Sequence, residues 1–393
     1  GKVGGGENAA ETGIEEVRGM IETPTNLLEI IQHAKARNMS DGEIETAYLQ
    51  YLLQKARDKG VPLAGIFELT PLCNLSCKMC YVHLQPDQMG NRSLLRFEQW
   101  KEIIDQAYEM GMVRVTLTGG ECLTYPEFDK LYLYLQSLGI RATILTNGLL
   151  LTEKYIRFFK EYPTNCIQVT MYGHSDNEYE RVCGVRCFEL VSKNIEKAWK
   201  AGLKLHIAIT PNRFLDDGGI SLMRYVSSLG IPYIVNSRLH APREETGRAD
   251  DEIELDEDAY LRLYQARAEL DGIELTPVDA CKVPEPSVDC SEVKYGLKCM
   301  AGTCAFHIAW DGSMTPCASF RAIVERPLET GFAAAWQSIN EYVSKLPVPS
   351  ECETCVYKKK FAVHSRDAPV GHASKRICER TKRLAELGFI KFD

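Results

Sequence analysis

From residue 64 onward, short strand-like runs alternate with amphipathic stretches, and this alternation constrains the fold more than any other feature of the chain. The strand-like runs are AGIFELT (64–70), VRVTLT (113–118), RATILT (141–146), CIQVTMY (166–172), LKLHIAIT (203–210) and PYIVNS (232–237). The stretches between them include 97–110, 126–139, 187–202 and 219–229. Such β/α units in series predict a parallel sheet with right-handed crossovers and helices on its outside. Six units are too few for a closed eight-stranded barrel, so we predict an α/β fold with an open, partial (β/α)6 barrel, its chemistry at the carboxyl ends of the strands.

The chain before the first strand has a helical pattern. Apolar residues recur at helical spacing in 24–37 and 40–59, which predicts an N-terminal helical extension over residues 21–62. Residues 1–20 are rich in Gly and begin without Met. We therefore expect them to lie outside the fold, as a segment that is disordered or was added by cloning.

The composition of the 393 residues is that of an ordinary globular protein, 45% hydrophobic and 25% charged. The net charge of −8 argues against a nucleic-acid partner, because phosphate binding needs clustered Lys and Arg side chains. No apolar run is long enough to span a bilayer, and no signal-peptide pattern opens the chain. We expect no membrane partner and a cytoplasmic location.

Fifteen cysteines are a high count for such a chain. Without a secretion signal, they indicate metal ligation or thiol chemistry rather than disulfides. They form a tight group at 73–80, single residues between 122 and 187, and a third group from 281 to 378. Single cysteines commonly serve as small packing residues, and we interpret Cys166 in this way.

The tight group follows the first strand directly, in the sequence PLCNLSCKMCYVHL. Its spacing is Cys73-x3-Cys77-x2-Cys80, and three thiolates so close on one loop can hold one iron–sulfur cubane while the backbone directs amides at the sulfurs. One iron then has no protein ligand. The alternative is a zinc site, which needs a fourth ligand, and His83 is the local candidate.

This loop, placed after the first strand of a partial barrel, resembles the signature of the radical S-adenosylmethionine (SAM) superfamily. The resemblance extends over residues 63–240, and we assign residues 63–245 to a radical SAM partial barrel. It implies that the amino and carboxylate groups of SAM chelate the open iron of a [4Fe-4S] cluster. It also implies that one electron cleaves SAM to methionine and a 5′-deoxyadenosyl radical, which abstracts hydrogen from a substrate.

Further residues match the family in register. The second strand ends in Gly119-Gly120-Glu121, which resembles the family's GGE motif, where the glycines permit close backbone approach and the carboxylate accepts from the SAM ammonium. The resemblance also implies SAM contacts for Asn147 in a TNG sequence, Thr170 near the ribose, Arg181 at the carboxylate and Tyr81 at the adenine. The alternatives are a turn at Asn147, a structural strand position at Thr170 and a solvent-exposed charge at Arg181.

The C-terminal part of the chain indicates which group of radical SAM enzymes the chain resembles. After a linker and helix at 246–280, residues 281–393 resemble a SPASM extension, a cysteine-rich domain with auxiliary iron–sulfur clusters, through Cys299-x12-Gly312-x4-Cys317 and a WDG turn between two strands. The implied ligands of one or two auxiliary clusters are Cys299, Cys304 and Cys317 for one site, and Cys352, Cys355 and Cys378 for another. Each set is one ligand short. Cys281, Cys290 or His364 could complete a site, or one iron could stay open for a substrate thiolate or water. The alternative is that one cysteine group is vestigial or binds zinc.

The resemblance favours modification of a peptide or protein side chain, namely ribosomal peptide maturation by thioether formation, carbon–carbon crosslinking or epimerisation. The alternatives are oxidation like that of an anaerobic sulfatase maturase, a radical reaction on a sugar or cofactor precursor, and a non-catalytic iron–sulfur electron-transfer protein. A reductant such as flavodoxin or ferredoxin is an implied partner. An epimerase needs a thiol that returns hydrogen to the substrate, and the candidates are Cys122, Cys183 and Cys187.

Overall fold

The computed structural model describes residues 40–236, 239, 253–272 and 300–346. The strands are β1 Ala64–Glu68, β2 Arg114–Thr118, β3 Arg141–Thr146, β4 Cys166–Met171, β5 Leu205–Ile209, β6 Tyr233–Val235, β7 Ala305–Ile308 and β8 Met314–Thr315. The α-helices are α3 Asp41–Lys59, α4 Phe97–Glu109, α5 Phe128–Ser137, α6 Glu153–Glu161, α7 Asp176–Cys183, α8 Phe188–Lys200, α9 Ile220–Ser228, α10 Glu257–Asp271, α11 Pro327–Thr330 and α12 Phe332–Ser344. Two short 3-10 helices are η1 Pro86–Met89 and η2 Cys122–Thr124.

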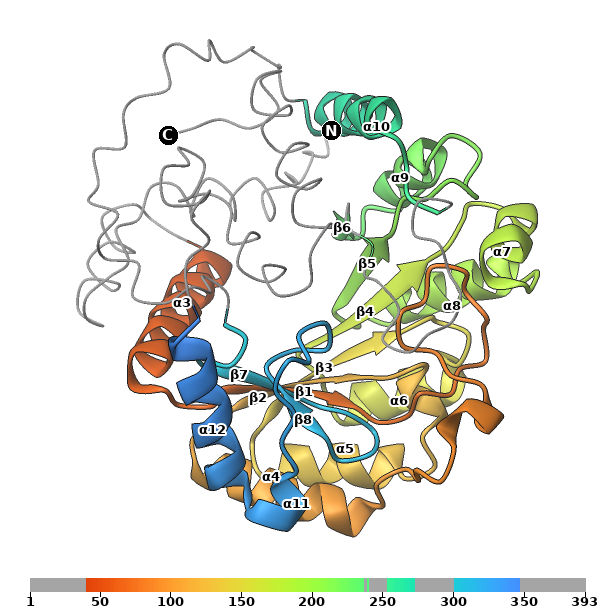
Figure 1. Ribbon diagram of the computed structural model, residues 1–393. Helices are drawn as coiled ribbons and strands as arrows, with labels where there is room; N and C mark the ends of the chain where they lie inside the picture. Colours follow the sequence, from red (N-terminus) through yellow and green to blue (C-terminus); the bar gives the residue numbers. More distant parts are fainter. Residues whose placement is uncertain (1–39, 237–238, 240–252, 273–299, 347–393) are drawn as a thin grey trace.

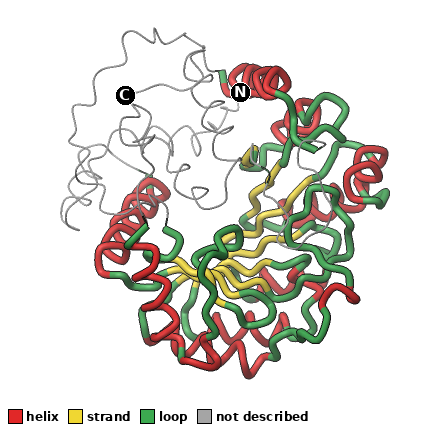
Figure 2. The backbone as a smooth tube through the Cα atoms, viewed as in Figure 1, coloured by secondary structure: helices red, strands yellow, loops and turns green. Residues whose placement is uncertain are grey.

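The strands form one open sheet in the order β6-β5-β4-β3-β2-β1-β7-β8. The first six strands pair in parallel with their neighbours in sequence, which confirms the predicted partial (β/α)6 barrel. Figure 2 shows the strands as a continuous, twisted fan with helices along its outer side. Because the strands are parallel, their carboxyl ends and the loops that follow them gather at one edge.

The helices cover the outer face of the sheet because each carries an apolar stripe. In α4 the buried residues Trp100, Ile103, Ile104 and Ala107 recur at helical spacing. The Trp100 ring lies 5.0 Å from the ring of Phe67 on β1, measured between centroids. Figure 1 places α4, α5 and α6 along the same side of the sheet. Side chains alternate along a strand, so Glu68, which follows Phe67 on β1, points to the inner face of the sheet.

The part of the C-terminal region that the structure describes is joined to the barrel. Strand β7 pairs in parallel with β1, and β8 pairs antiparallel with β7 across the predicted WDG turn. Helix α12 lies beside α3 (Figure 1), and Trp336 Nε1 donates to Gly60 O at 2.6 Å. Residues 300–346 belong to the predicted SPASM-like domain and C-terminal helix over 281–393, and they extend the barrel sheet through β7 and β8. Pairing with β7 satisfies the backbone N–H and C=O groups along the edge of β1 that faces away from β2.

The outer segments agree with the sequence where the structure describes them. Helix α3 begins directly after Ser40. Helix α10 begins directly after Asp256, whose side-chain oxygen caps the helix by accepting from Ala259 N at 2.8 Å. The predicted segments 1–20 and 24–37 lie outside the described residues. In the described part of the chain, no helix combines the length and apolar character that crossing a bilayer requires.

Candidate functional site

The cysteine triad lies on the loop that leaves the carboxyl end of β1, residues 69–85, called the cysteine loop below. Two backbone N–H groups of this loop point at sulfur. Leu75 N donates to Cys73 Sγ at 3.4 Å, and His83 N donates to Cys80 Sγ at 3.2 Å. Such bonds stabilise a thiolate and tune an iron–sulfur cluster. The expectation that loop amides are directed at the sulfurs is confirmed.

The two glycines after β2 let this loop approach closely. Gly120 N donates to Thr70 O at 2.6 Å, and Glu121 N donates to Leu72 O at 3.0 Å. A Cβ atom at Gly119 would lie 2.5 Å from Thr70 O, and one at Gly120 would lie 2.3 Å from Leu72 O. Both positions exclude a side chain, because these oxygens belong to the backbone of the cysteine loop.

Glu121 is buried behind these glycines. Its Oε1 accepts from Leu123 N at 3.1 Å and Thr146 Oγ1 at 2.8 Å, and its Oε2 accepts from Asn147 N at 2.8 Å. Burial raises the pKa of Glu121, and these hydrogen bonds oppose the rise. The Cys122 thiol is 3.9 Å from Oε1 and also donates to Leu145 O at the shorter distance of 3.1 Å. An ionised carboxylate accepts about four hydrogen bonds, so beyond its three N–H and O–H donors roughly one place remains for a bound ammonium group.

Asn147 links the loops after β1 and β3. Its Nδ2 donates to Asn74 Oδ1 at 2.7 Å and contacts Cys73 Sγ at 3.6 Å. Its Oδ1 accepts from Leu149 N at 3.0 Å. The structure thus brings Asn147 together with a triad cysteine and with Glu121, whereas its SAM contact stays a prediction.

These residues fit an iron–sulfur cluster better than a single zinc ion. The sulfurs of Cys73, Cys77 and Cys80 do not form a set within 4.8 Å of one another. Thiolates on one zinc ion, each ~2.3 Å from it, lie within about 4.6 Å. Sulfurs on different irons of a cubane are held farther apart. Burial raises the pKa of the Cys73 thiol to about 12, so ligation replaces a proton there.

Tyr172, which follows β4 directly, is a residue near the triad that the sequence did not single out. Burial, followed by the charge that nearby thiols would carry, raises the pKa of Tyr172 well above its usual value. The thiols concerned are those of Cys77, Cys183, Cys80 and Cys73. The Tyr172 ring packs edge-on against Tyr179, with 6.2 Å between centroids. An aromatic residue directly after the fourth strand was the available signal, because chemistry lies at strand ends.

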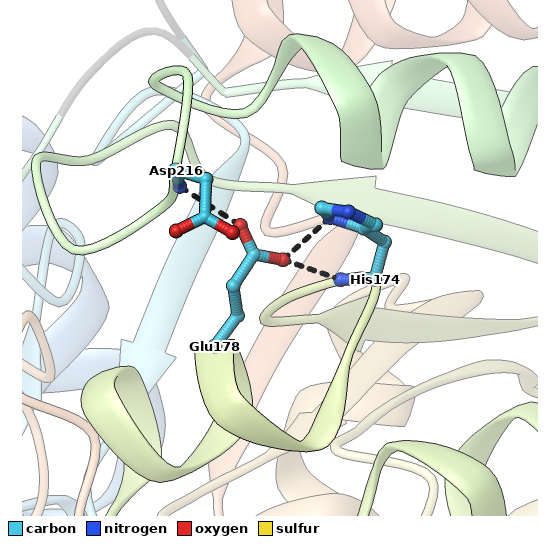
Figure 3. A group of neighbouring side chains, drawn as sticks. All are labelled: His174, Glu178 and Asp216. Carbon is cyan, nitrogen blue, oxygen red and sulfur yellow. Dashed lines mark hydrogen bonds and ion pairs between the residues drawn. The ribbon is translucent and has the colours of Figure 1, made fainter.

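The loops after β4 and β5 are tied together by Glu178, which is buried on α7 (Figure 3). Its Oε2 accepts from His174 N at 2.7 Å, and its Oε1 accepts from Asp216 N at 2.9 Å. The ring nitrogen Nδ1 of His174 lies 2.6 Å from Oε2, but without the alignment of a hydrogen bond. Backbone donors thus occupy this carboxylate, which indicates that it positions the two loops.

Arg181, the predicted partner of the SAM carboxylate, has protein partners here. Its Nε donates to Phe214 O at 3.0 Å, and its guanidinium pairs with the carboxylate of Asp216. Thr170 is half-buried on β4, and Tyr81 is half-buried on the cysteine loop. SAM contacts by these three predicted residues stay predictions.

The three candidate hydrogen donors are buried thiols. Cys122 Sγ donates to Leu145 O at 3.1 Å, Cys183 Sγ lies 3.5 Å from Cys77 Sγ, and Cys187 precedes α8. Burial raises the pKa of each thiol, that of Cys187 to about 11. Burial does not favour the predicted transfer of hydrogen to a substrate, a role that stays a prediction.

Two of the predicted auxiliary ligands are described. Cys304 is buried in a small apolar cluster with Ala56 and Leu63, whereas Cys317 packs at the edge of the main core. The structure therefore places these two side chains in different apolar groups. The other predicted ligands lie outside the described residues, as do the candidate fourth ligands: Cys299, Cys352, Cys355, Cys378, Cys281, Cys290 and His364. Auxiliary ligation stays a prediction.

Comparisons with known proteins agree with this site. Residues 67–217 match the model of the radical SAM superfamily. The sporulation killing factor maturation protein SkfB of Bacillus subtilis is 23% identical over 317 residues, 79% of this chain and 73% of that protein. The AdoMet-dependent heme synthase of Methanosarcina barkeri is 24% identical over 318 residues, 75% of this chain and 89% of that protein.

The fold is similar to that of Streptococcus suis SuiB. The structure of SuiB bound to S-adenosylmethionine has a TM-score of 0.61 at 18% identity, over 92% of this chain and 88% of SuiB. SuiB bound to precursor peptide SuiA has a TM-score of 0.60, over 89% of this chain and 82% of SuiB. With the triad, the glycine contacts and the buried glutamate in place, residues 67–217 form a radical SAM domain.

Proposed function

We propose that this enzyme modifies a peptide or protein side chain by hydrogen abstraction. The observation that carries the proposal is the joining of the β7–β8 hairpin to β1, the strand that leads into the cysteine loop. The fold likeness spans most of SuiB, which has been solved with a precursor peptide, and SkfB is a maturation protein. Both similarities support a peptide substrate.

Different residues of the site would hold the cluster and SAM. Cys73, Cys77 and Cys80 would ligate the cluster, and the absence of side chains at Gly119 and Gly120 lets the two loops meet. Glu121 would accept from the SAM ammonium through the place that its three N–H and O–H donors leave. SAM, when bound at the cluster, supplies a 5′-deoxyadenosyl radical upon one-electron reduction by a donor such as flavodoxin or ferredoxin.

The finer reaction belongs to the same proposal. Thioether formation, carbon–carbon crosslinking and epimerisation each begin with abstraction of a substrate hydrogen, and so does the oxidation of a sulfatase-type substrate. We place one or two auxiliary clusters in the C-terminal part, with Cys317 as a ligand. An auxiliary cluster near the substrate would accept the electron that an oxidative product releases.

A second candidate is the modification of a cofactor precursor. The similarity to the heme synthase, which covers 89% of that protein, favours this reading. The two candidates share the barrel chemistry and differ only in the substrate that the site admits.

The first experiment tests whether SAM is cleaved. Anaerobically reconstituted enzyme, given dithionite and SAM, should release 5′-deoxyadenosine and methionine. The Cys77→Ala variant should release neither product. The Cys166→Ala variant is the control: Cys166 lies at the amino end of β4, away from the carboxyl ends of the strands, and its loss should leave SAM cleavage at the wild-type level. A fully loaded wild-type enzyme that leaves SAM intact would support the electron-transfer alternative instead.

The second experiment separates the substrate classes. Candidate peptides and porphyrin precursors, each uniformly deuterated, are incubated with the loaded enzyme and SAM. Deuterium in 5′-deoxyadenosine from peptides alone supports the proposal. Deuterium from the porphyrin alone supports the second candidate and contradicts the first.

A further inference from the structure

The C-terminal turn of α7 is docked on the cysteine loop at the middle triad residue. Ser76 N donates to Cys183 O at 3.1 Å, and Lys78 N donates to Val182 O at 2.9 Å. These two bonds flank Cys77 on either side. Carbonyl groups at a helix end have no intrahelical partner, so the loop amides satisfy them. The docking fixes where the side chain of Cys77 stands relative to α7.

A second thiol faces Cys77 at this contact. Cys183 Sγ lies 3.5 Å from Cys77 Sγ, and Cys183 is fully buried. The sulfur of Cys73 has the amide of Leu75 as a donor, and that of Cys80 has the amide of His83. At the middle sulfur the corresponding contact comes from a side chain.

Cluster binding decides the direction of this hydrogen bond. A cysteine bound to iron is a thiolate and has no proton to donate, so the proton between the two sulfurs belongs to Cys183. Cys183 is also too near to be a ligand of a second iron, because sulfurs on different irons of one cubane stand farther apart than two hydrogen-bonded sulfurs. The remaining contact is an S–H group of Cys183 that points at the Cys77 thiolate.

We propose that Cys183 is a positioning residue of the SAM-binding cluster, whose thiol donates to the Cys77 thiolate and raises the reduction potential of the cluster. Reduction adds one electron from a low-potential donor and increases the negative charge on the ligand sulfurs. A hydrogen bond to sulfur is stronger in that state and therefore favours it. The proposal concerns cluster reduction and holds for either substrate class.

Helix α7, whose C-terminal turn carries Cys183, also contacts the loop after β5. Glu178 and Arg181 on α7 hold that loop through Asp216, and Lys78 lies 4.1 Å from the ring centroid of Phe214. A shift of the loop after β5 would therefore displace the C-terminal turn of α7, which carries Cys183 and is docked on the cysteine loop.

The test is an EPR-monitored redox titration of anaerobically reconstituted enzyme without SAM. The Cys183→Ala variant should show a more negative midpoint potential, with a two- to tenfold lower ratio of reduced to oxidised cluster at a fixed potential, since a hydrogen bond contributes about 0.5–1.5 kcal/mol. The Cys183→Ser variant retains a donor and should return toward the wild-type value. The Cys166→Ala variant, the matched control, should not shift.

Equal potentials in wild type and Cys183→Ala at full iron content would overturn the proposal, and so would equal shifts in the Ala and Ser variants. A measurement on the wild-type chain covers the case in which the variants lose the cluster. Cluster-free enzyme treated with diamide, which takes up two electrons and two protons as the thiols join, should yield a Cys77–Cys183 linked peptide by mass spectrometry. Oxidation of other thiols without this peptide would show that the two sulfurs are not adjacent.

Discussion

His307 on β7 and Glu68 on β1 form a buried pair across the two strands, with 3.3 Å between Nε2 and Oε2. Both side chains are at most 1% exposed. Thr315 donates its hydroxyl hydrogen to Cys317 O at 3.0 Å, so its oxygen accepts from His307 Nδ1 at 3.1 Å. With Nδ1 protonated, one further proton is shared between Nε2 and the carboxyl group, and the pair as a whole is neutral.

This pair predicts a large difference between single and double substitutions. The His307→Leu variant leaves the Glu68 carboxyl group in the core without the imidazole and should lose about 3–5 kcal/mol of unfolding free energy. The double variant Glu68→Leu/His307→Leu removes both polar groups and should recover most of that loss. Denaturant unfolding measures all three proteins. Additive losses in the double variant would show that the two residues do not interact.

The glycine contacts predict a second effect, on cluster loading. In Gly120→Ala the new Cβ would lie 2.3 Å from Leu72 O, so the cysteine loop must move, and we expect iron content below about half that of wild type with a stability loss of about 2–4 kcal/mol. The control is Gly139→Ala, which has a φ of +71° but no atom within 4 Å of the new Cβ. It should cost only about 1 kcal/mol and keep its iron. Equal iron contents in the two variants would refute this prediction.

Glu121 predicts an effect on SAM affinity. The Glu121→Gln variant keeps an acceptor oxygen but loses the negative charge, so SAM binding should weaken roughly 10- to 100-fold, as expected for the loss of a charge-assisted hydrogen bond of about 1.5–3 kcal/mol. Equilibrium binding to the loaded, oxidised enzyme gives the dissociation constant. Glu127→Gln is the matched control, since Glu127 accepts from Phe97 N at 2.7 Å on a neighbouring loop and should leave SAM binding unchanged. Unaltered affinity in Glu121→Gln would exclude the ammonium contact.

Asp311 in the β7–β8 turn predicts a pH dependence of stability. Burial disfavours its ionised form, but hydrogen bonds from Ser313 and the charges of Arg326 and Arg321 outweigh this effect and lower the pKa of Asp311. A lowered folded-state pKa contributes stability above the unfolded value of about 3.9, and the contribution is lost as the pH falls through the folded-state pKa. Asp311→Asn should therefore be less stable at pH 7, by about 1 kcal/mol.

The check is the difference in melting temperature between wild type and Asp311→Asn, measured from pH 7 to pH 3. The difference should shrink as the pH falls below about 4, because the wild type then loses what the variant already lacks. A difference that stays constant across this range would mean that the ionised form of Asp311 contributes nothing.

Much of the fold followed from local patterns. The six parallel strands and helices α4, α5, α8 and α9 lie within a few residues of their predicted bounds, because alternating apolar runs and helical stripes are encoded in neighbouring residues. The pairing of β7 with β1 was missed, because it joins residues about 240 positions apart and a strand pattern does not specify its partner strand.

The same division holds at the site. The triad cysteines share one loop and Gly119, Gly120 and Glu121 are consecutive, so the local sequence was enough to predict a cluster loop and, through the family resemblance, a carboxylate for SAM. Tyr172 and the role of Glu178 were not anticipated, since both depend on which loops meet at the edge of the sheet. Arg181 was expected at SAM, but its carboxylate partner is Asp216, a residue on another loop.

The sequence by itself determined the number and direction of the barrel strands and which three cysteines are the predicted cluster ligands, because these follow from periodicity and from cysteines that share one loop. Only the tertiary structure decided what surrounds those ligands. Cys183 meets Cys77 across 106 residues, and Asn147 meets Cys73 across 74, because parallel strands bring their carboxyl ends to one edge whatever their separation along the chain.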